Sequence, residues 1–258
     1  MVEVHALLKK ALSGSPLLGT WITVESPDVA EALSLVPLDF LVIDLEHSSL
    51  GYKEAERILM SLKGDTAGIV RVPWNSHVEI KKALDIGAHG VLVPWVNSGE
   101  EARQVAASVL YPPRGIRGFG PRRASLYGHI PLRKYFETYE EDLIVIVQIE
   151  TRQAVQNLEE ILSVENINGI LVGPNDLSAS LGIYGLYDRP EFVETVREVA
   201  AKARGRKPLV AFFAPTPEMA IAAYKMGYNM ISFSADVFVL VQAYKGLVSS
   251  FKSAVGLS

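Results

Sequence analysis

The chain has 258 residues, of which 49% are hydrophobic and 21% charged, so it can bury a large core and global disorder is excluded. A net charge of −4 leaves no broad basic surface for nucleic acid, and the absence of cysteine excludes disulfides, thiolate zinc sites and a cysteine nucleophile. Residues 1–13 have no signal-peptide core, and no apolar run approaches the roughly 20 residues that span a bilayer. We therefore expect a soluble, cytoplasmic protein.

Strand-like and helix-like segments alternate along the whole chain after a short N-terminal helix within residues 1–13. Apolar runs predict eight strands, at 17–23, 40–44, 67–72, 89–94, 143–149, 168–172, 209–213 and 229–233. Helical spacing follows nearly every strand, with longer segments at 52–62, 78–84, 98–109, 131–141, 151–162, 189–203 and 235–248. This alternation predicts parallel strands covered by helices, and eight units in this length favour a single (β/α)8 barrel domain over residues 1–258.

Polar residues stand at the carboxyl ends of several predicted strands. The strand 40–44 is apolar until it ends in Asp44, and Glu46 and His47 follow at once. In a parallel barrel the carboxyl ends of all strands meet at one rim, which is where such folds place their chemistry. We expect convergence of the polar residues that end the strands, namely Asp44, Glu46, His47, Arg71, Gln148, Glu150, Asn175 and Asp176.

Two of these carboxylates suit a divalent metal. Glu150 and Asp176 come from neighbouring strands, and carboxylate oxygens with open water positions suit Mg²⁺, Mn²⁺ or a similar ion. Each also has a structural alternative. Asp176 could cap a short helix at 177–181, and Glu150 could be a first-turn carboxylate favoured by the helix dipole.

His47 and Arg71 are the other chemical groups at the predicted rim. Imidazole titrates near neutral pH, so His47 is the expected general base. Asp44, Glu46 and Asp85 are candidates for the carboxylate that would orient it. Arg71 is a fixed cation that could stabilise a developing oxyanion, and a structural salt bridge is its alternative role.

Several reaction classes lack their sequence signatures. The chain has no Walker sequence, no dinucleotide fingerprint and no nucleophile elbow. No lysine lies within a predicted strand, where burial would lower its pKa for imine chemistry. A metal-dependent route is therefore favoured over a lysine imine. The Pro-, Gly- and Arg-rich segment 111–128 is long for a loop in a compact domain, which predicts a functional or disordered segment.

Ordered motifs are spread over nearly the whole chain, namely Asp44-Leu-Glu-His47, Val70-Arg-Val-Pro73, Leu84-Asp-Ile-Gly87, Leu92-Val-Pro94, Tyr111-Pro-Pro-Arg-Gly-Ile-Arg-Gly118, Val147-Gln-Ile-Glu-Thr151 and Gly173-Pro-Asn-Asp-Leu-Ser178. Together they resemble the HpcH/HpaI family of metal-dependent (class II) pyruvate aldolases. The resemblance implies reversible cleavage of a 4-hydroxy-2-oxoacid to pyruvate and an aldehyde through a metal-stabilised enolate. It also implies a homo-oligomer, a hexamer or trimer of dimers, with C-terminal helices exchanged between subunits.

The resemblance also implies roles for individual residues. The metal, Mg²⁺, Mn²⁺ or Co²⁺, would be held by Glu150 and Asp176. The implied catalytic residues are His47 as base, Asp85 raising its basicity, Arg71 stabilising the transition state, and Asp44. The implied substrate contacts are Gln148, Gly173, Pro174, Asn175, Asp176 and Arg123.

Two departures from the family pattern bear on the aldehyde half of the substrate. Segment 118–125 is shorter than the usual loop, and Asn175 stands where alanine is frequent. We expect both near the mouth of the barrel. Arg122 or Arg123 could bind a carboxylate on the aldehyde half, or either could contact another subunit. The competing functions are a lyase acting on acyl-CoA thioesters, like the citrate lyase β-subunit and malyl-CoA lyase, and a non-catalytic barrel used for binding.

Overall fold

The computed structural model describes residues 4–141 and 143–257, and its eight strands form one closed parallel barrel in sequence order. The strands are β1 (Leu17–Ile22), β2 (Phe40–Asp44), β3 (Ala67–Arg71), β4 (Gly90–Val93), β5 (Ile144–Ile149), β6 (Gly169–Val172), β7 (Leu209–Ala214) and β8 (Met230–Ala235). Each pairs in parallel with its neighbours, and β1 with β8 closes the ring. The predicted (β/α)8 barrel is confirmed.

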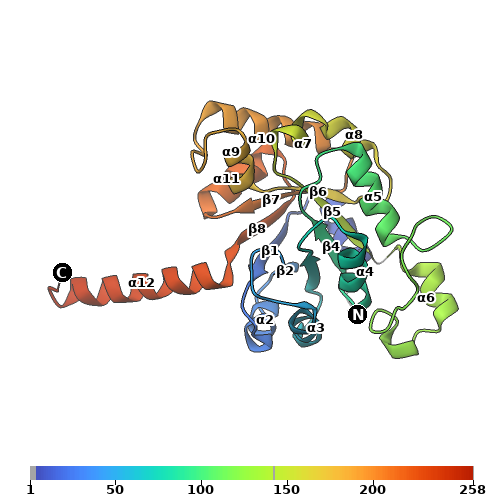
Figure 1. The fold of residues 1–258 in the computed structure, drawn as a ribbon. Coiled ribbons are helices and arrows are strands. Elements are labelled where there is room, and N and C mark those ends of the chain that lie inside the picture. The colour runs from blue at the N-terminus through green and yellow to red at the C-terminus, as the bar shows by residue number, and fades with distance from the viewer. Residues whose placement is uncertain (1–3, 142, 258) are drawn as a thin grey trace.

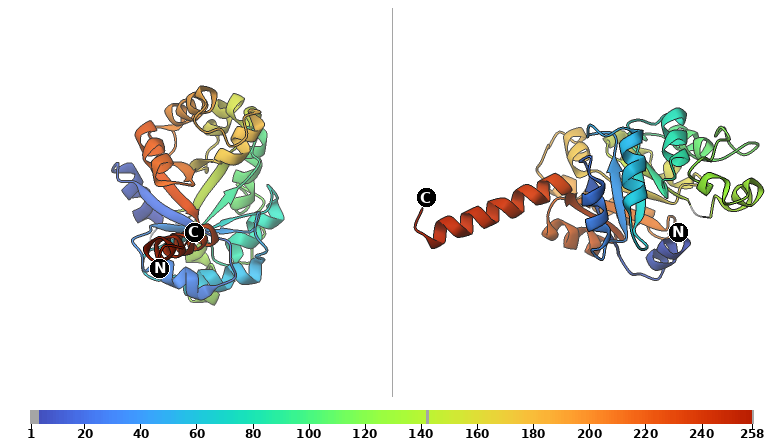
Figure 2. Two further views of the ribbon diagram at one scale, coloured as in Figure 1. Left: turned by 90° about the vertical axis from the view of Figure 1, so that its left-hand side faces the viewer. Right: turned by 90° about the horizontal axis from the view of Figure 1, so that it is seen from below.

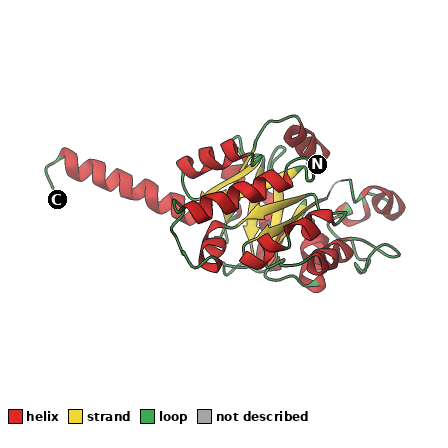
Figure 3. Ribbon diagram, turned by 90° about the horizontal axis from the view of Figure 1, so that it is seen from above, coloured by secondary structure: helices red, strands yellow, loops and turns green. Residues whose placement is uncertain are grey.

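Helices surround the barrel (Figure 3). They are α1 (Val4–Leu12), α2 (Pro27–Ser34), α3 (Tyr52–Ser61), α4 (His77–Asp85), α5 (Gly99–Val109), α6 (Leu132–Thr138), α7 (Arg152–Gln156), α8 (Leu158–Ser163), α9 (Pro174–Ser180), α10 (Pro190–Ala203), α11 (Pro217–Met226) and α12 (Asp236–Ala254), with a 3₁₀ turn at Leu126–Gly128. Local chemistry starts several of them. Ser26, for example, accepts a hydrogen bond from the Val29 amide, and Pro27 occupies the first turn. Within the described ranges, no helix combines the length and apolar character needed to cross a membrane.

The two-residue alternation of the strands separates two apolar clusters. On β2, Phe40 and Val42 belong to the cluster inside the barrel, whereas Leu41 and Ile43 pack outward under the helices. Asp44 lies two residues after Val42, so its side chain points into the barrel like those of Phe40 and Val42. The same parity on β3 and β5 turns Arg71 and Gln148 inward. The barrel interior is therefore apolar along most of its length and becomes polar only at the carboxyl end.

The two ends of the barrel differ. Helix α1 contributes Leu7 and Ala11 to the inner cluster, so it covers the amino end of the strands. In Figure 1 this end, with the N-terminus and α6, lies on the right, and α12 leaves the carboxyl end on the left.

Helix α12 does not pack back onto the barrel. No α12 residue is buried in the chain, and Figure 1 and the right-hand view of Figure 2 show it projecting away from the other elements. It runs to Ala254, six residues beyond its predicted end at 248.

Two other elements differ from prediction. The predicted helix 151–162 is two helices, α7 and α8, which meet at Asn157. Helix α9 starts at Pro174 with Gly173 as its N-cap, three residues before the predicted start at 177. Asp176 is therefore in the first turn of α9, so its alternative role as an N-cap is wrong.

Candidate active site

A cavity of about 250 Å³ opens at the carboxyl end of the strands. One wall is polar and carries Asp44, His47, Arg71, Gln148 and Asp176. Three aromatic side chains, Trp21, Phe213 and Phe238, also line the cavity and form its aromatic wall. The cavity also meets Gly173, Pro174 and Asn175. The structure thus brings most of the predicted site residues together, although they span positions 44 to 176.

Arg71 is the centre of the polar wall. It lies opposite Asp44 in the β2–β3 register, and its Nε and Nη2 atoms donate to the two Asp44 oxygens at 2.8 and 2.7 Å. Its Nη1 atom is 3.0 Å from a Glu46 carboxylate oxygen and donates to Gln148 Oε1 at 3.4 Å. The guanidinium also stacks over the Trp21 ring at 4.4 Å. This buried cation is fixed on several sides and holds the carboxylates of Asp44 and Glu46 in place.

Glu150 is a buried carboxylate held at the same rim. Its Oε1 accepts the Trp95 amide at 2.7 Å, and its Oε2 accepts Gln148 Nε2 at 2.5 Å. Burial raises the pKa of Glu150 to about 7, and the nearby Glu46 and Asp176 carboxylates raise it further, against the lowering effects of the Trp95 amide and Arg71. Trp95 holds this amide in position with a φ of +57°, a left-handed backbone conformation that is rare for a large residue.

Glu46 is the second buried carboxylate of the cluster. Burial raises its pKa to about 7, with Arg71 opposing the shift and Asp44 and Asp176 adding to it. Its Oε2 atom is buried and has no hydrogen-bond donor among the described residues, although it lies near Arg71. Glu46, Glu150 and Asp176 thus form a group of carboxylates whose mutual repulsion would be relieved by a cation.

This donor set fits the divalent metal ion expected from the sequence. Glu150 and Asp176 offer oxygen ligands, and Mg²⁺-type ions are commonly bound by one or two carboxylates with substrate and water completing the shell. A metal-binding group of three or more His, Cys, Asp or Glu residues is not found in the part of the chain that the structure describes. The predicted ligand set has two protein side chains and is compatible with that finding.

His47 lies at the edge of the cavity. Its side chain is 62% exposed, and its Nε2 atom is 3.8 Å from Glu46 Oε2. Its backbone amide donates to Asp44 Oδ1 at 3.2 Å, which fixes the loop that carries it. Of the three carboxylates considered as its partner, Glu46 is therefore the one near the imidazole within a single chain.

Asp85 and Arg123 are not brought to this cavity within one chain. Asp85 ends α4, so it lies at the amino end of the barrel, where its carboxylate accepts from Arg117 Nη2 at 2.9 Å. Arg123 lies beside it and donates to the carbonyls of Ile86 and Gly87 at 3.1 and 3.2 Å. The expectation that segment 118–125 lies near the mouth is therefore wrong for a single subunit, because this segment precedes β5 and runs at the opposite end.

The sequence analysis missed the aromatic wall and Trp95. Trp21 and Phe213 share the inward parity of the apolar residues before them on β1 and β7. Large aromatic residues at the last inward position of a strand were therefore a usable signal. No local signal marked Trp95, because its contact with Glu150 joins residues 55 positions apart.

A parallel barrel with buried acids and a fixed guanidinium at its carboxyl rim is typical of (β/α)8-barrel enzymes. The family model "HpcH/HpaI aldolase/citrate lyase" matches residues 17–243, and the chain belongs to this family.

Similar proteins agree with this assignment. The chain is 36% identical over 247 residues to a 5-keto-4-deoxy-D-glucarate aldolase of Citrobacter koseri, covering 95% of each chain. A 5-keto-4-deoxy-D-glucarate aldolase of Salmonella arizonae is 35% identical, with 91% of this chain and 92% of that protein covered. A solved HpcH/HpaI aldolase/citrate lyase family protein from Burkholderia cenocepacia superposes with a TM-score of 0.89 at 28% identity, covering 96% of this chain and 99% of that one.

The chain is therefore an aldolase, a carbon–carbon lyase of the metal-dependent class II type, that reversibly cleaves a 4-hydroxy-2-oxoacid to pyruvate and an aldehyde.

Proposed function

We propose that Glu150 and Asp176 hold a Mg²⁺, Mn²⁺ or Co²⁺ ion and that the rim cavity binds the 2-oxoacid against it. The observation that carries this proposal is the convergence of three carboxylates, Glu46, Glu150 and Asp176; the pKa values of Glu46 and Glu150 are raised mainly by burial and further by neighbouring carboxylates. When bound, the ion would supply positive charge beside the carboxylate and keto oxygens of the substrate.

The residues of the chain have separable roles in this proposal. His47 accepts the proton of the C4 hydroxyl as the C3–C4 bond breaks, and the bonding electrons move toward the C2 oxygen. Arg71 faces the charge that develops there and Gln148 orients the 2-oxoacid, with Gly173, Pro174 and Asn175 forming the adjacent surface. Asp44 positions Arg71 through its two hydrogen bonds.

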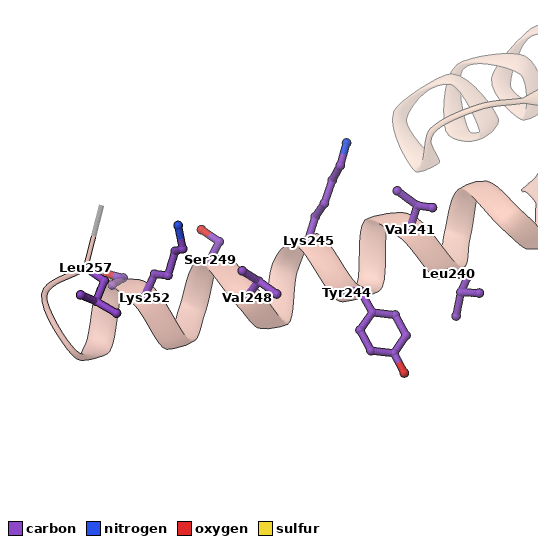
Figure 4. A pocket seen from close by; sticks show the side chains of 9 residues that line it. Leu240, Val241, Tyr244, Lys245, Val248, Ser249, Lys252 and Leu257 are labelled. Atoms are coloured by element: carbon purple, nitrogen blue, oxygen red, sulfur yellow. The ribbon is translucent and has the colours of Figure 1, made fainter.

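We propose further that the working enzyme is a homo-oligomer, a hexamer or trimer of dimers. Helix α12 carries exposed apolar residues along its length, among them Leu240, Tyr244, Leu247, Val248 and Phe251. Some of them line an open groove on α12 itself (Figure 4). A second copy of the chain would cover this surface by exchange of the helix.

Assembly also bears on two residues that lie outside the cavity of a single chain. Asp85 and Arg123 are at the amino end of the barrel, so the implied pairing of Asp85 with His47 requires contact between two subunits. A role of Arg123 toward the substrate has the same requirement.

The cytoplasmic location stays a prediction from the sequence.

The similar aldolases indicate which substrate to test first. They are named for 5-keto-4-deoxy-D-glucarate, so we propose this sugar diacid, or a close analogue, as the substrate of first choice. Cleavage would be followed as pyruvate release.

The metal proposal is tested by chelation and by one ligand substitution. Protein treated with EDTA should lose pyruvate-forming cleavage, and Mg²⁺, Mn²⁺ or Co²⁺ should restore it. Glu150→Gln should weaken metal binding at least about tenfold in calorimetry because it removes a charged ligand. Glu100→Gln is the matched control, since Glu100 is exposed on α5. Full activity in EDTA, or unchanged affinity in Glu150→Gln, would contradict the ligand assignment.

A further inference from the structure

The first turn of α12 forms part of the substrate cavity. Phe238 lines the aromatic wall with Trp21 and Phe213, although its helix runs away from the barrel (Figure 1). Asp44, Arg71 and Gln148 lie on the polar wall. In the proposed function the pyruvate half is held at the polar wall, so the aldehyde half extends toward the mouth and the aromatic wall.

Two of the three aromatic rings are fixed within the chain. The Trp21 indole donates to Ser232 Oγ at 2.9 Å, and its ring meets the Phe213 ring edge-on, with centroids 5.6 Å apart. Trp21 is 4% exposed, whereas Phe238 is 66% exposed. Phe238 makes no ring–ring contact in the described part of the chain. Its place in the cavity is therefore set by the direction of α12.

The junction between β8 and α12 sets that direction. The β1–β8 register shifts between Thr20 and Trp21, and Ser234 has a φ of +43°, so the end of β8 is bulged. The Asp236 carboxylate then accepts the Thr23 amide at 2.9 Å, the Thr23 hydroxyl at 2.6 Å and the Val24 amide at 3.2 Å. These bonds hold the first turn of α12 against the residues that follow β1. Asp236, which accepts them, precedes Phe238 by two residues.

We propose that Phe238 is a specificity-determining residue of the aldolase and that Asp236 is the residue that positions it. This inference rests on the proposed function. The Phe238 ring bounds the outer part of the cavity, where it contacts the carbon chain of the aldehyde and limits its length. Aldehyde preference is then a property of the α12 junction as well as of the barrel.

The experiment compares aldehydes of two lengths in the synthesis direction. Pyruvate is combined with acetaldehyde or pentanal, and kcat/KM is measured for each in the presence of Mg²⁺. Phe238→Ala should raise the pentanal-to-acetaldehyde ratio by about tenfold or more, since a few methylene groups in an apolar pocket discriminate by that order. Tyr224→Ala is the control, because it truncates an exposed aromatic side chain on α11 that does not line the cavity, and it should leave the ratio unchanged.

A second pair of variants tests the positioning role. Asp236→Ala removes all of the bonds to Thr23 and Val24 and should shift the ratio in the same direction as Phe238→Ala. Thr23→Val removes only the hydroxyl bond and should produce a smaller shift. Light scattering on every variant would separate a change in assembly from a change in preference.

The outcomes distinguish the two levels of the proposal. If the unmodified protein shows no metal-dependent exchange of pyruvate protons with solvent, the proposed function fails and this inference fails with it. If exchange and cleavage occur but Phe238→Ala leaves the aldehyde ratio unchanged, or lowers kcat/KM equally for both aldehydes, only the role of Phe238 is overturned.

Discussion

Arg71 has a position that only an arginine fills. Its planar guanidinium makes two parallel bonds to Asp44, a third contact to Glu46 and a fourth to Gln148, while its face stacks on Trp21. A lysine would keep the charge but would present one ammonium to these partners. Asp44 and Glu46 would then no longer hold the cation in a fixed orientation toward the cavity.

Arg71→Lys should therefore lower kcat/KM at least about 100-fold, the scale of losing one preorganised donor to a developing oxyanion. Metal affinity should change much less, because Glu150 and Asp176 remain. Steady-state cleavage kinetics and metal calorimetry check the two parts. Arg133→Lys, on the exposed face of α6, is the matched control. Activity within a fewfold of the unmodified protein would contradict the role of Arg71.

At this scale much of the site could be predicted from sequence. Asp44, Arg71, Gln148 and Glu150 could be predicted because each stands at or next to the carboxyl end of an apolar strand. Asp85 and Arg123 were misplaced for a single chain because the family pattern gives roles without giving the end of the barrel. The order of elements does give that end, since a helix that precedes a strand finishes at the amino end of that strand.

At the scale of elements, His89 joins β3 to the start of β4. It precedes β4, and its Nδ1 atom accepts the Gly68 amide of β3 at 3.0 Å. Burial lowers the pKa of His89 to about 4, and the positive charge of Arg123 adds to the shift. The imidazole is therefore neutral in the folded protein, and protonation would break the bond to Gly68.

Folding stability should consequently depend on pH between the folded pKa of about 4 and the ordinary value of 6.5. In this window the unfolded chain binds the proton and the folded chain does not, so acid favours unfolding. Neutral His89 contributes at most roughly 3 kcal/mol to the free energy of unfolding. This contribution is present above pH 6.5 and is lost as the pH falls toward 4.

Urea unfolding of the unmodified protein and of His89→Gln, at several pH values, would measure this contribution. Glutamine can accept the Gly68 amide but does not titrate, so the variant should show a flatter dependence of the unfolding free energy on pH. The comparison cancels the carboxylates that titrate in both proteins. Parallel curves for the two proteins would refute the assignment to His89.

At the scale of the whole molecule, the barrel was predictable and the course of α12 was not. Eight apolar runs separated by helical segments specify a closed parallel sheet almost by count. The departure of α12 depends on the bulge at Ser234 and on the bonds between Asp236 and Thr23, which join residues more than 200 positions apart. Local sequence patterns carry no information about such contacts.

The exposed apolar surface of α12 leads to the last prediction. Leu247 is 65% exposed on a helix that contributes no buried residue to its own chain. Burying a leucine side chain stabilises a subunit contact by about 1.5–3 kcal/mol. In a two-fold symmetric contact both subunits bury this leucine, so the contribution doubles. Leu247→Glu would place a charge in that contact, so the assembled protein should dissociate into smaller species.

Light scattering after size-exclusion chromatography would measure the mass of the particles in solution. Leu35→Glu is the matched control, because Leu35 is also highly exposed, at the end of α2, and lies outside the proposed contact. Circular dichroism of the Leu247→Glu variant should keep the barrel signal, since α12 supports no part of the core. A monomeric unmodified protein, or a Leu247→Glu variant that stays assembled, would show that α12 does not hold the subunits together.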